Sequence, residues 1–383
     1  MAVSDPMNAL ATERAWIEVD GGAIAHNIRA LQSLLKPGTD LLAVVKANAY
    51  GHGSIQVANL AQRLGVKYFG VATVPEGVEL RQAGIRASIL VMGAVQTRNQ
   101  IEAIAQWNLE PTLCHPDQAR IFSEVLTAAL PVHLKLDTGM SRLGYPWEQG
   151  VDFIAQVAAL PHLHIASIYS HLATADDPDP SFMKEQQARF EDVIGQLRTA
   201  GIPIPALHLA NSAGTLFSPA LHYDRVRVGL SLYGIYPGPQ VEAVIDLKPA
   251  MQVRARIVQI KDLPPGVGVS YGHRYVTSKP CRVATVSIGY ADGVPRNLSN
   301  RMEVLVRGQR VPQRGVITMD QIVIDITDVS GVAAGDMVTL LGQDGDRHIL
   351  AEEWSQLLDT IPYEIVCGFQ QRLPRIEANP SAS

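Results

Sequence analysis

The sequence predicts an α/β protein built as a (β/α)8 TIM-type barrel followed by a mainly β C-terminal domain. Strand-like apolar runs alternate with amphipathic helical stretches from residue 21 to about 236, and after Tyr236 short runs rich in valine and isoleucine replace them. With 383 residues, 47% of them hydrophobic, the chain can bury a core in both the barrel and the C-terminal domain. We therefore expect a flexible tail at 1–14, a barrel over 15–236 and a β domain over 237–383.

Eight strands, each separated by one helix, are expected in the barrel. The strands are expected at 41–46, 68–72, 88–92, 110–113, 132–137, 163–170, 206–210 and 224–228. The helices are expected at 22–35, 54–65, 76–84, 97–107, 116–128, 147–160, 181–200 and 212–218. A doubly wound open sheet is the competing fold, but eight regular units and the lack of a G-x-G-x-x-G motif after the first strand disfavour it.

The second domain is expected to be mainly β. Its short apolar runs cover 250–260, 281–288, 302–306, 310–314, 316–326, 336–341 and 363–370, with one amphipathic helix at 351–359. Turn signals such as Pro264-Pro265-Gly266 separate them. The run Ala15–Asp20 has no place in the barrel count and is a candidate extra strand of this second domain.

Composition excludes several classes of protein. A net charge of -5 and a pI near 6.1 disfavour a nucleic-acid partner. No stretch approaches the roughly 18 apolar residues of a membrane span, and residues 1–12 lack the pattern of a signal peptide. Three widely separated cysteines, Cys114, Cys281 and Cys367, indicate reduced thiols in a cytoplasm, and no metal site is expected.

Lys46 is the first candidate catalytic group. It closes the apolar run 41–45 and precedes a loop with Tyr50, Gly51 and Gly53. An ammonium in an apolar wall has a lowered pKa, so that its free amine can form a Schiff base with a carbonyl. A lysine that simply leaves the sheet for solvent is the ordinary alternative.

Further polar residues follow other strands of the barrel. Reactive groups of such barrels gather at the C-terminal strand ends, and phosphate commonly binds after strands seven and eight. The polar positions there, besides Lys46, are Arg142, His171, Asn211, Ser212 and Arg227, with Gly229 and Leu230 after strand eight. A Schiff-base lysine beside a phosphate site indicates pyridoxal phosphate. Taken singly, Asn211-Ser212 is also an ordinary helix cap, and Arg227 is equally explained by a buried ion pair with Asp224 or a rim carboxylate.

Long motifs of the chain resemble those of the alanine racemases, from about Ala15 to Ile376. The most specific is Ala43–Gly53, which contains Lys46. The others are Lys135–Gly144, Arg227–Gly234, Val269–Gly272, Ile288–Gly293, Met319–Gln321 and Ile361–Glu364. The resemblance implies racemisation of L-alanine and D-alanine with pyridoxal 5'-phosphate, supplying D-alanine for peptidoglycan, by a head-to-tail homodimer with shared active sites.

The resemblance also assigns roles to individual residues. Lys46 corresponds to the base on the D-alanine side and Tyr271 to the base on the L-alanine side, contributed by the partner subunit. Without the resemblance, Tyr271 would be a turn tyrosine beside Gly272. Arg227 corresponds to the donor to the cofactor's pyridine nitrogen. His171 and Arg142 correspond to groups that tune these bases.

The remaining assignments concern cofactor and substrate contacts. Arg142 corresponds to the residue facing the cofactor's phenolic oxygen and the substrate carboxylate. The phosphate-binding set corresponds to Tyr50, Ser212, Gly229, Leu230 and Tyr363, and the substrate-site positions correspond to Met319 and Tyr290. Lys135 corresponds to a lysine often carbamylated in that family, where the negative group orients Arg142.

One departure from the family pattern concerns specificity. The segment before Met319 reads Gly315-Val316-Ile317-Thr318, where family members usually have Gly-Arg-Val followed by Cys or Ser. The absence of this arginine from the access corridor makes a serine or broader-specificity racemase the nearest alternative. A decarboxylase of the same fold type would place a carboxylate, not Arg227, against the pyridine nitrogen. A non-enzymatic pyridoxal phosphate carrier would lack the β domain and Tyr271.

Overall fold

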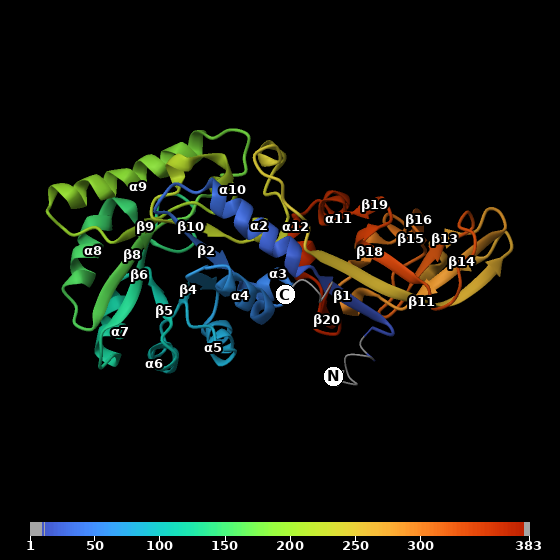
Figure 1. The fold of residues 1–383 in the computed structure, drawn as a ribbon, viewed down its shortest axis with the longest axis horizontal. Helices are drawn as coiled ribbons and strands as arrows, with labels where there is room; N and C mark the ends of the chain where they lie inside the picture. The colour runs from blue at the N-terminus through green and yellow to red at the C-terminus, as the bar shows by residue number, and fades with distance from the viewer. Residues whose placement is uncertain (1–9, 11, 379–383) are drawn as a thin grey trace. The chain divides into compact units, whose positions relative to one another are not determined.

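The structure, a computed structural model, describes residues 10 and 12–378. Packing divides the chain into two units (Figure 1). One unit is Ala23–Lys248, and the other combines the segment that ends at Gly22 with the segment that begins at Pro249. Within the described residues, none of the helices has the length and apolar character needed to cross a lipid bilayer.

The unit Ala23–Lys248 is a closed parallel barrel, which confirms the predicted fold class. Its strands are β2 (Asp40–Val44), β3 (Tyr68–Val71), β4 (Ser88–Ala94), β5 (Glu110–Leu113), β6 (Leu130–Asp137), β8 (Leu163–Tyr169), β9 (Ala206–His208) and β10 (Arg225–Val228). Each strand pairs with the next, and β10 returns to β2, so the ring has no open edge. The two-residue β7 (Tyr145–Pro146) adds to β6.

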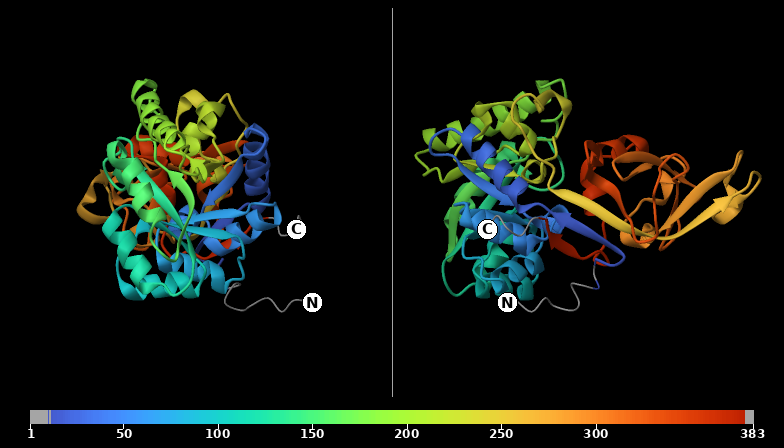
Figure 2. Two further views of the ribbon diagram at one scale, coloured as in Figure 1. Left: turned by 90° about the vertical axis from the view of Figure 1, so that its left-hand side faces the viewer. Right: turned by 45° about the vertical axis from the view of Figure 1, so that its right-hand side comes forward.

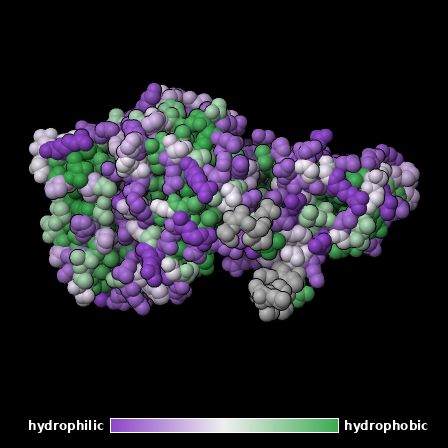
Figure 3. Space-filling view, in the orientation of Figure 1, coloured by the Kyte–Doolittle hydropathy of each residue, from purple (hydrophilic) through white to green (hydrophobic). Residues whose placement is uncertain are grey.

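Helices surround this barrel (Figure 2). They are α2 (Gly21–Leu34), α4 (Ser54–Arg63), α5 (Val74–Gln82), α6 (Arg98–Gln106), α7 (Pro116–Val125), α8 (Gly150–Ala158), α9 (Ser181–Thr199) and α10 (Ser212–Phe217). Each buries an apolar stripe, as α9 does with Phe190, Val193 and Leu197. Figure 3 shows hydrophilic side chains interspersed with hydrophobic ones on the outer surface of these helices. The helices therefore cover the outer side of the barrel strands (Figure 2).

The other unit is mainly β. Its nine-stranded sheet runs in the order β19 (Arg347–Ile349), β18 (Met337–Asp344), β15 (Glu303–Val306), β16 (Gln309–Arg314), β17 (Ile322–Asp325), β14 (Cys281–Val286), β11 (Met251–Leu263), β1 (Ala15–Val19) and β20 (Arg375–Glu377). A small ribbon joins β12 (Gly268–Val269) to β13 (Tyr275–Val276). Two helices, α11 (Ala351–Leu358) and α12 (Pro362–Cys367), complete it. The run 15–20 thus supplies a strand of this sheet, antiparallel to β11 and parallel to β20.

Three details differ from the sequence-based expectations. Only Ile322–Asp325 of the run 316–326 is a strand, and 363–370 begins as helix α12 because Pro362 occupies its first turn. Residues 237–248 pack with the barrel, where Asn27 bonds the Leu232 carbonyl and the Lys248 backbone, so the boundary falls after Lys248. Of the tail expected at 1–14, residues 1–9 and 11 lie outside the described part. Arg14 is anchored by Asp292.

Candidate active site

The polar residues singled out in the barrel lie together at the C-terminal ends of its strands. Lys46 follows β2, Arg142 follows β6 and His171 follows β8. Asn211 and Ser212 follow β9, while Arg227, Gly229 and Leu230 lie at the end of β10. Because all eight strands are parallel, these positions share one face of the barrel, where the chemistry of such barrels takes place.

Lys46 is followed by a left-handed turn of backbone. Ala47, Asn48, Ala49 and Tyr50 have φ between 52° and 54°, a conformation that costs about 1–2 kcal/mol for each residue with a side chain. Glu76 of α5 stabilises the turn by accepting a hydrogen bond from the Ala47 N–H at 2.7 Å. The Asn48 side chain accepts another from the Ser54 N–H at 2.8 Å. The turn reverses the chain directly after Lys46 and brings Tyr50 back over the barrel end.

Tyr50, Ser212 and Gly229 converge on one point. A Cβ on Gly229 would lie 2.5 Å from the Tyr50 hydroxyl oxygen, so any larger residue here would force the phenol to move. The Gly229 N–H donates to Ser212 Oγ at 3.1 Å. Asn211 instead caps α10, because its side-chain oxygen accepts from the Gly214 N–H at 2.9 Å. The hydroxyls of Tyr50 and Ser212 therefore meet the Gly229 backbone at one place, and this cradle is suited to phosphate oxygens.

Arg227 is buried in the barrel and donates only to neutral acceptors. Its guanidinium bonds His208 Nδ1 (2.9 Å), His171 Nδ1 (3.1 Å) and the carbonyls of Ser170 (2.7 Å), Leu209 (3.0 Å) and His208 (3.1 Å). No carboxylate of the described residues lies within 4.0 Å of it. Asp224, the partner considered from the sequence, accepts from the Leu207 N–H instead. Burial lowers the pKa of Arg227 to about 10, so the side chain stays cationic at neutral pH.

The surroundings of Arg227 are strongly electropositive. Burial, and then the charges of Arg227, Lys135, Arg142 and Lys46, hold the pKa of His171 well below its ordinary value. His171 is therefore neutral, and its Nδ1 can accept from Arg227. Burial, reinforced by the charge of Arg227, also lowers the pKa of Lys135 to about 8. Four cations around a neutral histidine suit an anionic ligand such as a phosphate ester or a carboxylate.

Tyr271 and the remaining predicted residues belong to the β unit. Tyr271 begins a short 3-10 turn and is 73% exposed. It lines a pocket of about 490 Å³ together with Val316 and Thr318, so the segment that departs from the family pattern lies beside the predicted second base. The Ser270 hydroxyl donates to the Val316 carbonyl at 2.6 Å and fixes the loop that carries Tyr271.

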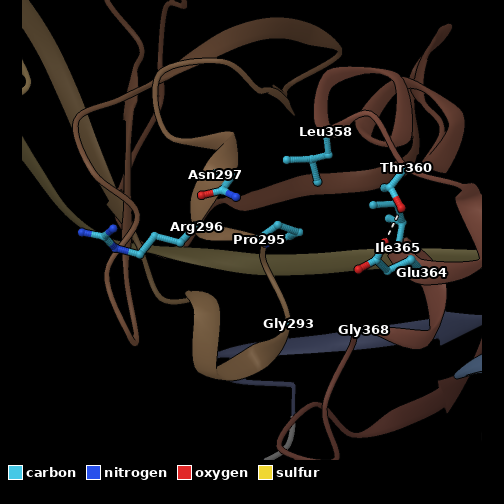
Figure 4. A pocket seen from close by; sticks show the side chains of 9 residues that line it. All are labelled: Gly293, Pro295, Arg296, Asn297, Leu358, Thr360, Glu364, Ile365 and Gly368. Atoms are coloured by element: carbon cyan, nitrogen blue, oxygen red, sulfur yellow. Dashed lines mark hydrogen bonds between the residues drawn. The ribbon is translucent and has the colours of Figure 1, made fainter.

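Tyr290 and Met319 lie on adjoining loops of the same unit. The Tyr290 N–H donates to the Thr318 carbonyl at 2.9 Å, and both Tyr290 and Met319 expose large apolar side chains. Tyr363 lies on α12, and the residue after it, Glu364, borders a separate pocket of about 360 Å³ together with Arg296 (Figure 4). The structure thus joins Tyr271 to Val316 and Thr318, and Tyr290 to the loop of Met319.

Two residues of the barrel site were not predicted from the sequence. Glu76 supports the turn after Lys46, and its sequence signal is the capping box that it forms with Thr73 at the start of α5. His208 accepts from Arg227, but a single histidine near the end of a buried strand gives no signal of this contact. Its role follows only from the neighbouring strand β10.

Comparisons with known proteins agree along nearly the whole chain. Residues 19–237 match the family model described as alanine racemase, N-terminal domain, and residues 250–377 match that of the C-terminal domain. An alanine racemase of Nostoc sp. is 56% identical over 370 residues, covering 95% of this chain and 96% of the relative. The crystal structure of alanine racemase from Bacillus anthracis with bound L-Ala-P is 34% identical, with a TM-score of 0.90 and 96% of each chain covered. That from Bartonella henselae, with covalently bound pyridoxal phosphate, is 32% identical, with a TM-score of 0.86 and 95% and 99% covered.

Proposed function

This chain belongs to the alanine racemase family, and on that premise we propose how its own residues interconvert L-alanine and D-alanine. The observation that carries the proposal is the lysine–arginine pair at one barrel end. Lys46 follows the first strand, and Arg227, buried with no carboxylate of the described residues within 4.0 Å, lies on the last. An isomerisation at Cα needs a proton removed from one face and returned to the other, which calls for two bases.

The barrel end fits pyridoxal 5'-phosphate. Tyr50, Ser212 and the backbone at Gly229 and Leu230 would hold the phosphate in the cradle that a Cβ on residue 229 would fill. Lys46 would hold the aldehyde end, and Tyr363 is proposed to complete the phosphate contacts. When bound, the cofactor supplies an electron-withdrawing ring that acidifies the Cα–H of alanine.

Arg227 would donate to the pyridine nitrogen. Because a guanidinium has no acceptor and stays protonated, it leaves that nitrogen without a proton and the ring a weaker electron sink. Weak withdrawal favours return of the proton over side reactions such as transamination. Arg142, whose charge acts on both His171 and Lys135, would face the cofactor's phenolic oxygen and the substrate carboxylate.

The second base is proposed to come from another copy of the chain. Lys46 Nζ would exchange the proton on the D-alanine side, and the phenol of Tyr271 of the partner subunit would exchange it on the L-alanine side. The high exposure of Tyr271 supports this role, because the phenol is open to meet a ligand held by a second molecule. Met319 and Tyr290 of the partner subunit would border the substrate. The active form is thus proposed to be a head-to-tail homodimer.

The test is incubation of the purified protein, loaded with pyridoxal phosphate, with L-alanine in deuterium oxide. We expect deuterium at Cα and D-alanine on chiral chromatography. A decarboxylase would release carbon dioxide and form no D-alanine, and a carrier without activity would leave L-alanine unchanged. Either result would overturn the proposal. We further propose that the D-alanine serves peptidoglycan synthesis in the cytoplasm, consistent with three free cysteines.

A second candidate activity is racemisation of serine or of several amino acids. It is favoured by Val316 and Thr318 beside Tyr271, where neither side chain carries a charge. The same chiral assay over a panel of amino acids separates the two, because a strict alanine racemase leaves L-serine unchanged.

A further inference from the structure

A continuous line of five polar side chains crosses the interior of the barrel. Five adjacent strands, β5, β6, β8, β9 and β10, contribute one residue each. The line runs from Glu110 Oε2 to His133 Nε2 (2.7 Å), from His133 Nδ1 to Ser167 Oγ (2.5 Å), from Ser167 Oγ to His208 Nε2 (2.8 Å) and from His208 Nδ1 to Arg227 Nη1 (2.9 Å). We call this set the interior chain.

The interior chain lies where such barrels ordinarily pack branched apolar side chains. Ser167 and His208 are fully buried, and His133 and Arg227 almost so, while Glu110 opens slightly to solvent at the start of β5. A buried polar group without a partner is costly, and here every member of the set is bonded to the next. The Tyr169 ring stacks on His208 at 4.6 Å and excludes water from the middle of the line.

The chemistry of its ends gives the interior chain a single direction. Arg227 can only donate, so His208 Nδ1 accepts and His208 carries its proton on Nε2. That proton goes to Ser167 Oγ, whose one hydrogen must then go to His133 Nδ1. His133 in turn carries its proton on Nε2 and donates it to Glu110. A carboxylate only accepts, so both ends require the same arrangement.

The two ends also carry opposite charges. Burial alone would raise the pKa of the Glu110 carboxyl, but it is outweighed by the hydrogen bond from His133, the charge of that histidine when protonated, the hydrogen bond from Ser88 and the charge of Arg225, which together lower that pKa. Glu110 is therefore ionised at neutral pH. Arg227, which has no carboxylate within 4.0 Å in the described part of the chain, faces this charge through aligned hydrogen bonds. Aligned bonds polarise one another in a medium of low dielectric constant.

We propose that Glu110, His133 and Ser167 are positioning residues for Arg227, acting through the interior chain from the opposite end of the barrel. They fix His208 as the Nε2–H tautomer and so hold the guanidinium of Arg227 in place. The inference rests on the proposed function only in taking Arg227 to face the ring nitrogen of pyridoxal phosphate.

The direction of the interior chain is tested without cofactor or substrate. Long-range proton–nitrogen NMR of the full-length apoprotein, labelled with ¹⁵N at histidine, distinguishes the tautomers, and His133→Gln and His208→Gln assign the signals. We expect both histidines as the neutral Nε2–H form at pH 7 to 8. An Nδ1–H tautomer, an imidazolium or a mixture at either histidine overturns the proposal.

The positioning role is tested by a double-mutant cycle on Ser167→Ala and Glu110→Gln. Glu110→Gln removes the terminal charge and Ser167→Ala interrupts the line. We expect each alone to weaken binding of pyridoxal phosphate, titrated by its visible absorbance, by roughly three- to tenfold. Once Ser167 is replaced, Glu110→Gln should have no further effect. Independent, multiplicative losses would mean that the two residues do not act through one line, and the proposal falls.

The control is Ser123→Ala. Ser123 lies on the outer helix α7, and its hydroxyl donates a 2.8 Å hydrogen bond to the Pro161 carbonyl, so this variant also removes one bonded serine hydroxyl. It should lower the melting temperature and leave the affinity for pyridoxal phosphate unchanged. If Ser123→Ala lost as much affinity for pyridoxal phosphate as Ser167→Ala, general destabilisation would explain the loss in both variants. That result would overturn the proposal. The wild-type protein could show the expected tautomers, and the variants the expected coupling, while alanine is not racemised. In that case the proposed function fails and the proposal on the interior chain stands.

Discussion

At the scale of single residues, Lys135 is an unusual occupant of a barrel strand. It is 7% exposed, and no ion pair within 4.0 Å holds its ammonium in the described residues. Burial, followed by the charge of Arg227, lowers its pKa to about 8, so roughly a tenth of it is the free amine at pH 7 and about half at pH 8. A free amine reacts with carbon dioxide, and the product is an anion that would neutralise the surrounding cations. This supports a carbamylated Lys135.

We predict that Lys135 takes up carbon dioxide as a carbamate. Protein equilibrated with ¹³C-bicarbonate at pH 8 should give a carbamate carbon signal in the NMR spectrum. The matched variant Lys135→Gln should give none. A spectrum of the wild-type protein without that signal would leave Lys135 as a buried amine and would contradict the prediction.

A second prediction at this scale concerns Tyr271. Tyr271→Phe removes one hydroxyl from an exposed side chain, so the fold should be retained. We expect turnover of L-alanine to fall by about 100-fold or more, as for loss of a general acid–base group, while the visible absorbance of the bound cofactor persists. Loss of that absorbance together with activity would instead mark Tyr271 as a structural residue.

At the scale of secondary-structure elements, the left-handed turn after Lys46 makes a test of backbone strain possible. Ala47 is exposed and has φ of 52°, which glycine adopts freely and a β-branched residue resists. Ala47→Gly should therefore raise the free energy of unfolding or leave it unchanged, and Ala47→Val should lower it by about 1–2 kcal/mol.

The matched control is Ala105, an exposed alanine within α6. There Ala105→Gly should lower the free energy of unfolding by about 1 kcal/mol, the opposite sign from Ala47→Gly. Chemical denaturation of the three variants and of the wild-type protein gives the comparison. If Ala47→Gly destabilises as much as Ala105→Gly, the turn is not strained.

The elements of the barrel were predictable because each carries its own periodicity. All eight strands and their helices lie within a few residues of the ranges expected, since most strands are apolar runs bounded by turn residues. The turn Ala47–Tyr50 could not be predicted, because it contains no glycine and depends on Glu76 from another element. The run 363–370 could not be assigned by hydrophobicity alone, which does not separate a short buried helix from a strand.

The candidate site was predictable only in part. Strand ends identified Lys46 and Arg227, and the family resemblance supplied Tyr271. The interior chain had no signal, because Glu110, His133 and Ser167 are isolated polar residues in separate strands. Only closure of the barrel brings them into line.

At the scale of the whole molecule, buried histidines predict how stability depends on pH. Burial, followed by the charge of Arg227, lowers the pKa of both His171 and His208 well below the ordinary value. In the unfolded chain each takes up a proton below about pH 6.5, whereas in the folded protein it does not. Their contribution to the free energy of unfolding is thus full above pH 6.5. It is lost on acidification, by about 1.4 kcal/mol per pH unit for each histidine.

The measurement is urea denaturation of the apoprotein between pH 5 and 6.5. His171→Gln keeps an acceptor for Arg227 but has no group that can be protonated. The slope of the unfolding free energy against pH should therefore decrease by the amount that one histidine contributes to it. An unchanged slope in this variant would show that His171 is protonated in the folded state.

The shared active site predicts complementation between inactive variants. Lys46→Ala and Tyr271→Phe each lack one base. In a mixed dimer, one of the two sites would combine the intact lysine of one copy with the intact tyrosine of the other. Refolding the two variants together should restore roughly a quarter of wild-type activity, because half the dimers are mixed and each has one working site. Sites built within single chains would give no recovery.

The strand β1 has a consequence for the order in which the protein is made. Residues 15–19 leave the ribosome before any barrel strand, yet their hydrogen-bonding partners are β11 and β20, at residues 251–263 and 375–377. During synthesis the barrel can close while β1 still waits, unpaired and apolar, for strands not yet translated. Emergence of β11, and not completion of the barrel, is therefore the first step that can pair this segment, and its second edge stays open until β20 has been made.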